Sequence, residues 1–155
     1  MTEELVNLLI EKKLHISFAE SLTGGLCASK IISVSDASKI ISESYITYQD
    51  SAKIKILNVP KEIVDKYTVI SAECAYYMAK GLHEITDSDI CVSLTGLAGP
   101  NGDGIHDVGT VFIGIYYNND CLIKSLKLGN LGRNVVREMA ADEAIKLVYE
   151  VISHA

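Results

Sequence analysis

The sequence has 155 residues, of which 48% are hydrophobic and 22% charged, and its 14 basic and 20 acidic side chains give a formal net charge of −6. This length predicts a single domain over residues 1–155 with its own hydrophobic core. The composition excludes a disordered or collagen-like chain. The acidic balance argues against broad, sequence-independent nucleic-acid binding, which depends on neutralising phosphates, so we expect no nucleic-acid partner.

The chain also lacks the patterns of secreted and membrane proteins. Its first residues, Met1 to Glu4, are acidic where a signal peptide is basic, and no run of about 18 apolar residues occurs. The four cysteines are widely and irregularly spaced, which disfavours a zinc site and fits reduced, buried thiols. We therefore expect a cytoplasmic protein without a membrane segment.

Helical and extended patterns alternate along the chain. Helices are expected at 3–13, 26–34, 51–57, after Pro60, at 71–85 and at 133–154. Strands are expected at 15–19, 45–48, 90–94, 111–117 and 122–128, with a turn at 118–120 joining the last two. The clearest helix begins after Ser71, a good N-cap. The order predicts an α/β fold, a three-layer α/β/α sandwich on a mixed, mostly parallel sheet with a C-terminal β-hairpin.

The first candidate site is Ala19-Glu20-Ser21-Leu22-Thr23-Gly24-Gly25, where a predicted strand passes into a predicted helix. Open α/β sheets bind ligands at the carboxyl ends of their strands. Free N–H groups at the start of the helix favour an anion or oxyanion, and the glycines permit close approach. The same residues also fit a helix capped by Ser21 or Thr23 after a tight turn. No lysine follows the glycines, which excludes a P-loop.

The second candidate site is Tyr45-Ile46-Thr47-Tyr48-Gln49-Asp50-Ser51-Ala52-Lys53, where a strand ends and a short helix begins. Lys53 is expected one helical turn inside, in reach of the same crevice. The alternatives are a solvated surface lysine and a Tyr48 that packs on the sheet with its hydroxyl at the rim.

The third candidate is the segment 93–104, where a buried strand opens into a loop with more glycines than one turn needs. Such loops fold their N–H groups into anion-binding nests, although an ordinary long surface loop fits as well. Asp103, His106 and Asp107 carry metal-ligating atoms, but no spacing fixes a coordination geometry, so we expect no metal.

The fourth candidate is Arg133-Asn134-Val135-Val136-Arg137, at the start of the last helix. Two arginines four residues apart share a helix face. Cations in the first turn oppose the helix dipole, and an anionic ligand accounts for that placement. The alternative is a solvated face on which Glu138 or Asp142 pairs with the arginines.

Together, these four segments resemble the CinA C-terminal domain family, whose active members are nicotinamide mononucleotide (NMN) deamidases. The matching pieces are AESLTGG at 19–25, YITYQDSAK at 45–53, SLTGLAGPNG at 93–102, VGTV at 108–111 and RNVVR at 133–137. The resemblance covers nearly the whole chain. The sequence departs from the family at Asp107, where proline is usual, and over 129–133, where the family has Gly-Asp-Arg.

The resemblance implies an amidohydrolase that converts NMN to nicotinate mononucleotide and ammonia in pyridine nucleotide recycling. It implies Ser21 as the nucleophile, Lys53 as its base and Tyr48 as a residue that orients Lys53 or moves a proton. The implied substrate-binding residues are Thr23, Gly24, Gly25, Thr95, Gly96, Gly99, Arg133 and Arg137. Backbone N–H groups near Gly24 and Gly25 are expected to hold the oxyanion, and one of the two arginines the phosphate.

A hydrolysis of this kind uses water alone, so no cofactor is expected. The resemblance further implies a stand-alone form of the domain, a small-molecule nucleotide as the partner, and a homo-oligomer, most simply a dimer. The alternative function is a non-catalytic domain of the same family that binds a nucleotide or phosphate ligand without turnover.

Overall fold

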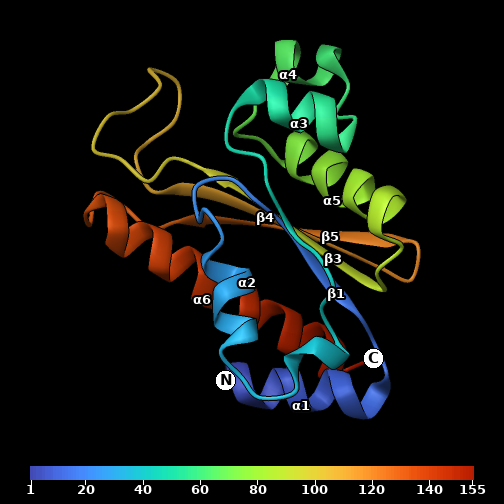
Figure 1. Ribbon diagram of the computed structural model, residues 1–155. Helices are drawn as coiled ribbons and strands as arrows, with labels where there is room; N and C mark the ends of the chain where they lie inside the picture. Colours follow the sequence, from blue (N-terminus) through green and yellow to red (C-terminus); the bar gives the residue numbers. More distant parts are fainter.

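A computed structural model describes all residues from Met1 to Ala155. One sheet lies between two layers of helices (Figure 1). Below the sheet in that view lie α1 (Thr2–Lys12), α2 (Leu26–Ile32) and α6 (Arg133–Ser153), with the short 3-10 helix η1 (Ala37–Lys39). Above it lie α3 (Asp50–Leu57), α4 (Lys61–Tyr67) and α5 (Ala72–Thr86). The predicted three-layer α/β/α sandwich is confirmed.

The sheet is mixed, as predicted. Its strands are β1 (Ile16–Glu20), β2 (Tyr45–Ile46), β3 (Ile90–Gly96), β4 (Thr110–Tyr117) and β5 (Asp120–Lys127), in the order β2-β1-β3-β4-β5. The strands β2, β1 and β3 run parallel, and β4 and β5 form the expected antiparallel hairpin beside β3. The strand expected at 45–48 is shorter than predicted, because the carbonyl groups of Thr47 and Tyr48 bind a lysine side chain instead of a neighbouring strand.

Alternation along the parallel strands divides the core into two parts. Phe18 of β1 and Val92 of β3 pack in the larger cluster with α1, α2 and α6, whereas Ala19 and Cys91 pack in the smaller one with α3 and α5. Ser71 caps α5 as predicted, because its hydroxyl accepts a hydrogen bond from the Cys74 N–H at 3.1 Å. The expected apolar stripe of α5 is buried.

Close contact between α3 and α5 depends on Gly81, in the middle of α5. A Cβ atom there would lie 1.8 Å from the backbone oxygen of Leu57, the last residue of α3. We predict that Gly81→Ala lowers the free energy of unfolding by about 1–3 kcal/mol, because α3 must move away. The sign of this change tests the packing. Without the contact to Leu57, alanine is expected to raise the free energy of unfolding by up to about 1 kcal/mol, because it favours a helix more than glycine does. Urea unfolding measures the change, and a more stable variant would contradict the packing.

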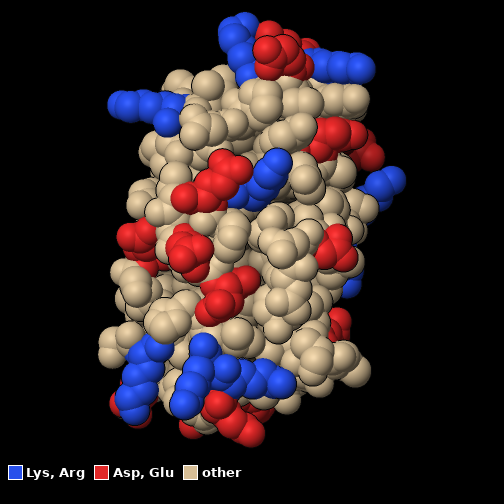
Figure 2. Space-filling model, turned by 90° about the vertical axis from the view of Figure 1, so that its right-hand side faces the viewer, with Lys and Arg blue, Asp and Glu red and all other residues tan.

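None of the helices has both the length and the apolar character that crossing a membrane requires. Figure 2 shows one side of the molecule, on which acidic side chains spread over the middle and basic ones gather near the top and bottom. This face carries no continuous basic stripe of the kind that follows a nucleic-acid backbone. The four cysteines are all free thiols.

Candidate functional site

Strand register brings three of the sequence-predicted segments to one edge of the sheet. Glu20, the last residue of β1, lies beside Ile46 of β2 and Leu94 of β3. The residues that follow these positions therefore meet at the carboxyl ends of the parallel strands, where ligands bind in open α/β sheets. A pocket of about 550 Å³ opens there. Seven expected site residues line it, namely Ser21, Tyr48, Lys53, Thr95, Gly96, Gly99 and Arg133.

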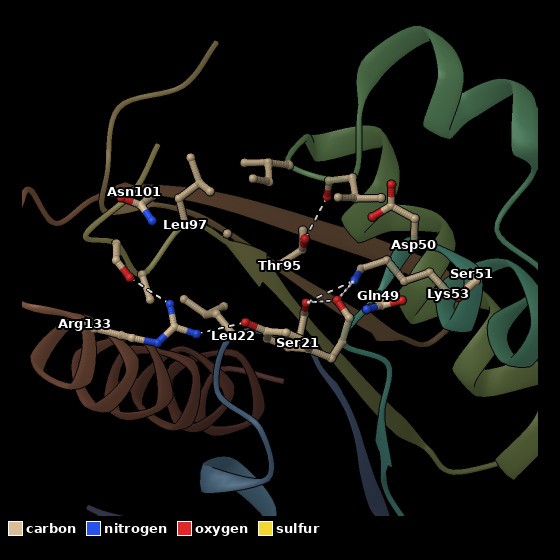
Figure 3. A pocket seen from close by; sticks show the side chains of 16 residues that line it. Ser21, Leu22, Gln49, Asp50, Ser51, Lys53, Thr95, Leu97, Asn101 and Arg133 are labelled. Atoms are coloured by element: carbon tan, nitrogen blue, oxygen red, sulfur yellow. Dashed lines mark hydrogen bonds between the residues drawn. The ribbon is translucent and has the colours of Figure 1, made fainter. Parts of the chain in front are cut away.

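Lys53 forms the floor of the pocket beside Ser21. It lies in the first turn of α3, one turn before the buried Leu57, so the helix directs both side chains inward. Only 1% of Lys53 and 6% of Ser21 is exposed, which excludes a solvated surface lysine. The Lys53 amine donates to the Ser21 hydroxyl at 3.0 Å and to the backbone oxygen of Tyr48 at 3.0 Å (Figure 3). It also donates to the backbone oxygen of Thr47 at 2.7 Å.

The three partners of this amine differ in what they do when it loses a proton. The backbone oxygens of Thr47 and Tyr48 accept only, so they retain the two N–H bonds of a neutral amine. The Ser21 hydroxyl also donates, so it alone can turn its proton toward the nitrogen lone pair. Ser21 already donates to the Tyr48 oxygen at 3.3 Å in the structure. The arrangement therefore permits a proton to pass from Ser21 to neutral Lys53.

Burial also favours the neutral form of Lys53. Loss of solvation lowers the pKa of Lys53 from its usual value of 10.5, although Cys74 and Asp50 act in the opposite direction. Burial raises the pKa of the Cys74 thiol to about 12. At neutral pH this thiol is uncharged and does not stabilise the ammonium form. The pair therefore has the groups that a serine nucleophile with an adjacent amine base requires.

The turn after Ser21 places only part of its backbone at the pocket. Leu22 lines the pocket, and its N–H group is hydrogen-bonded to no other group of the protein. The N–H of Gly24, by contrast, donates to the backbone oxygen of Ser21 at 3.1 Å. Thr23 is fully buried, and neither Gly24 nor Gly25 lines the pocket. These three expected substrate-binding residues thus shape the turn, and the free donor next to Ser21 is the N–H of Leu22.

Helix α2 does not offer its N-terminus to a ligand, contrary to the expectation from the sequence. The Glu20 carboxylate accepts from the Cys27 N–H at 2.9 Å and from the Ala28 N–H at 3.1 Å. The alternation of β1 directs Glu20 to the same side of the sheet as Phe18, where α2 packs. The anion that the helix start favours is therefore supplied by the protein itself.

Arg133 crosses one side of the pocket. Its guanidinium donates to the Gly99 oxygen at 2.7 Å and to the Tyr48 hydroxyl at 2.8 Å (Figure 3). The Tyr48 phenol therefore contacts Arg133 and not Lys53, which Tyr48 orients through its backbone oxygen. Neither Arg133 contact is with an acid, so the guanidinium keeps its full charge for a ligand. The N–H groups of Ala98 and Gly99, in the neighbouring loop, are also without protein partners.

Arg137 lies outside the pocket wall, although the sequence placed it among the candidate phosphate ligands. Its guanidinium donates to the Leu22 oxygen at 2.7 Å and to the Thr23 oxygen at 3.4 Å. It thereby braces the turn that follows Ser21. Glu138 and Asp142, the acids considered as partners of the arginines, bind Lys30 of α2 instead, at 2.8 and 3.2 Å.

Thr95 joins the pocket to the other helical layer. Its hydroxyl donates to the Val69 oxygen at 2.7 Å and its side chain is 1% exposed. Val69 and Ile70, which precede α5, form an apolar wall that sequence analysis missed. Two apolar residues in a connecting segment carry no local signal, and their place at the site depends on tertiary contacts such as that of Val69 with Thr95. The pocket wall is completed by Gln49, Asp50, Ser51, Leu97, Ala98 and Asn101.

The outer part of the 97–109 loop is held by its own side chains. Asp103 accepts from the backbone N–H groups of Ile105 and His106, and one of its oxygens lies 2.8 Å from the His106 ring nitrogen. Burial acts to raise the pKa of Asp103, but these bonds to His106 and Ile105 lower it to about 2. No group of three acidic, histidine or cysteine side chains converges to hold a metal ion.

Comparison with known proteins gives a single family. The family described as the CinA C-terminal domain matches residues 1–152. A CinA-like protein of Kosmotoga olearia is 44% identical over 149 residues, which cover 96% of this chain and 36% of that protein. A putative competence-damage inducible protein of Clostridium botulinum is 39% identical over 147 residues, covering 94% of this chain and 36% of its own. The chain thus spans about a third of the length of these curated relatives.

Solved structures give the same result. A competence-damaged protein (CinA) superfamily protein from Escherichia coli has a TM-score of 0.92 at 28% identity, covering 97% of this chain and 90% of that one. The competence/damage inducible protein CihA from Agrobacterium tumefaciens has a TM-score of 0.89 at 28% identity. The match covers 96% of this chain and 94% of the CihA chain.

Proposed function

Since this chain belongs to the CinA C-terminal domain family, we propose that it hydrolyses the carboxamide of NMN to give nicotinate mononucleotide and ammonia. The observation that carries the proposal is the buried hydrogen bond of 3.0 Å between the Lys53 amine and the Ser21 hydroxyl at the floor of the pocket. A domain that only binds a ligand has no need of a nucleophile that is hydrogen-bonded to a buried base.

The proposed reaction begins when neutral Lys53 takes the proton of Ser21, whose oxygen attacks the carboxamide carbon. We assign the free N–H of Leu22 as a backbone donor for the oxyanion, since it belongs to the residue after the nucleophile. The Lys53 ammonium then gives its proton to the departing nitrogen, and ammonia leaves an acyl ester on Ser21. Water, activated by the same amine, hydrolyses this ester and restores the hydroxyl.

The proposed substrate also carries a phosphate. Among the two arginines, Arg133 is the one that lines the pocket, beside the unpaired N–H groups of Ala98 and Gly99. A guanidinium with neighbouring backbone donors is a good phosphate site. We therefore assign the phosphate to Arg133 and this part of the loop. The homodimer, the cytoplasmic location and the absence of cofactor and metal remain predictions.

Ammonia release from NMN by the purified protein tests the proposal. Ammonia and nicotinate mononucleotide in equal amounts are expected. Binding of NMN by calorimetry without ammonia release would instead support the non-catalytic nucleotide-binding domain. If NMN is neither bound nor hydrolysed, both the amidohydrolase proposal and the nucleotide-binding alternative are contradicted.

A second prediction concerns Arg137, which we propose acts as a positioning residue through the Leu22 and Thr23 oxygens. Arg137→Gln is expected to lower kcat for NMN by about tenfold or more, because the turn beside the nucleophile loosens. KM is expected to change less than twofold, since Arg137 does not line the pocket. Steady-state kinetics of Arg137→Gln and Arg133→Gln compare the two roles: Arg133→Gln is expected to raise KM. A raised KM with unchanged kcat in Arg137→Gln would contradict the assignment.

A further inference from the structure

The pocket holds charges of both signs around the reactive pair. Arg133 enters from the start of α6, and Asp50 from the start of α3 (Figure 3). Asp50 is an exposed pocket residue, and its carboxylate makes no hydrogen bond or ion pair with the protein. The structure therefore leaves one anion of this wall available to a ligand.

Asp50 lies close to the chemistry, whereas Arg133 lies on another element. Residues three apart share a helix face, so Asp50 and Lys53 are neighbours on α3. Asp50 is near enough to counteract the fall in the pKa of Lys53. Asp50 and Arg133 thus lie on opposite sides of the reactive pair (Figure 3).

This separation of a negative from a positive side chain matches one class of amide. In a pyridinium carboxamide nucleotide, the positive ring carries the reacting amide and a sugar separates the ring from the negative phosphate. With the amide carbon at Ser21, the ring must lie beside the reactive pair, and the phosphate must lie away from it. We propose that Asp50 is a specificity-determining residue that selects amides on a cationic ring over amides on a neutral ring. This inference rests on the proposed function.

The natural probe is the pair formed by NMN and its reduced, 1,4-dihydro form. The two share the carboxamide, ribose and phosphate, but the reduced ring is uncharged. Affinity is measured by calorimetry in a Ser21→Ala background, where the ligand persists, with and without Asp50→Asn. We expect Asp50→Asn to weaken NMN binding by about fivefold, the size of a partly solvated charge pair. Binding of the reduced form is expected to change less than twofold.

Turnover gives a second readout on the protein with intact Ser21. The ratio of kcat/KM for the two substrates is compared between wild type and Asp50→Asn, so that their different intrinsic reactivities cancel. If Asp50 acts only by way of Lys53, both substrates change equally and the ratio is constant, which overturns the inference. Equal affinity losses for both ligands, or none, overturn it as well. A fall in the ratio of about fivefold supports it.

Two variants serve as controls. Glu62 lies in the first turn of α4, as Asp50 lies in the first turn of α3, but Glu62 is outside the pocket. Glu62→Gln is therefore expected to change the affinity for neither ligand. Arg133→Gln is expected to weaken the binding of both ligands equally, because both carry the phosphate. Ammonia release by wild type decides the proposed function, whereas the affinity ratio decides charge selection even if NMN is bound without turnover.

Discussion

Ser21→Ala is expected to lower ammonia release from NMN by about 10⁴-fold or more, the scale on which nucleophile removal acts in comparable hydrolases. The variant removes the group that accepts from the Lys53 amine at 3.0 Å. Its fold is expected to persist, because the Tyr48 oxygen that Ser21 contacts also accepts from Lys53. Ammonia assay and thermal unfolding together measure the two effects.

Ser51→Ala is the matched control for this variant. Ser51 also lines the pocket and lies on α3, the helix of Lys53, but its hydroxyl makes no hydrogen bond to Lys53. Its loss is expected to cost less than about tenfold, because no base activates it. Comparable losses in Ser21→Ala and Ser51→Ala would show that the pocket tolerates no truncation and would remove the support for Ser21 as the nucleophile.

Lys53→Met is expected to reduce the rate as strongly as Ser21→Ala. Methionine has a similar length but no basic nitrogen, so the Ser21 hydroxyl is no longer activated. Groups that act as a unit are not additive, and the double variant is therefore expected to match either single one. Lys53→Arg is expected not to restore activity, since a guanidinium remains protonated and cannot accept the serine proton. Activity in Lys53→Arg would argue for a purely electrostatic role of this side chain.

The pH dependence of the rate follows from the lowered pKa of Lys53. In the proposed mechanism the neutral amine is the active form, so kcat/KM is expected to rise with pH and to level off below 10.5, the usual pKa of lysine. A rate that falls as pH rises through this range would contradict a neutral lysine base. The pH profile is measured on the wild type, and Ser21→Ala serves as the inactive control at each pH.

The same shift has a consequence for stability, with a defined sign. The unfolded chain binds the Lys53 proton more tightly than the folded protein, so burial of this amine costs stability at pH below the folded pKa. This cost is relieved as pH rises from the lowered folded pKa toward 10.5. Relative to Lys53→Met, wild type is therefore expected to gain stability over that window. Urea unfolding of both proteins across the window measures the difference.

Much of the fold was predictable because its signals are local. The apolar stripe and Ser71 cap of α5 appear in the sequence as a helical period behind a capping residue, and both are confirmed. The β4–β5 hairpin follows from two strand patterns around the Asn118–Asn119 turn, where both residues have positive φ. The strand expected at 45–48 was too long, because a side chain from α3 takes its last two carbonyl groups.

The candidate site was predictable as a set of segments and not as a geometry. Nothing local shows that Glu20 fills the start of α2, that Arg137 braces the turn while Arg133 enters the pocket, or that Val69 closes a wall through Thr95. Each of these outcomes depends on which groups the packed layers bring within hydrogen-bond distance. The sequence determined which chemistry is present, because residue type and local period are written in it. The tertiary structure decided which of those residues face the pocket, because burial and partners depend on contacts between residues distant in the chain.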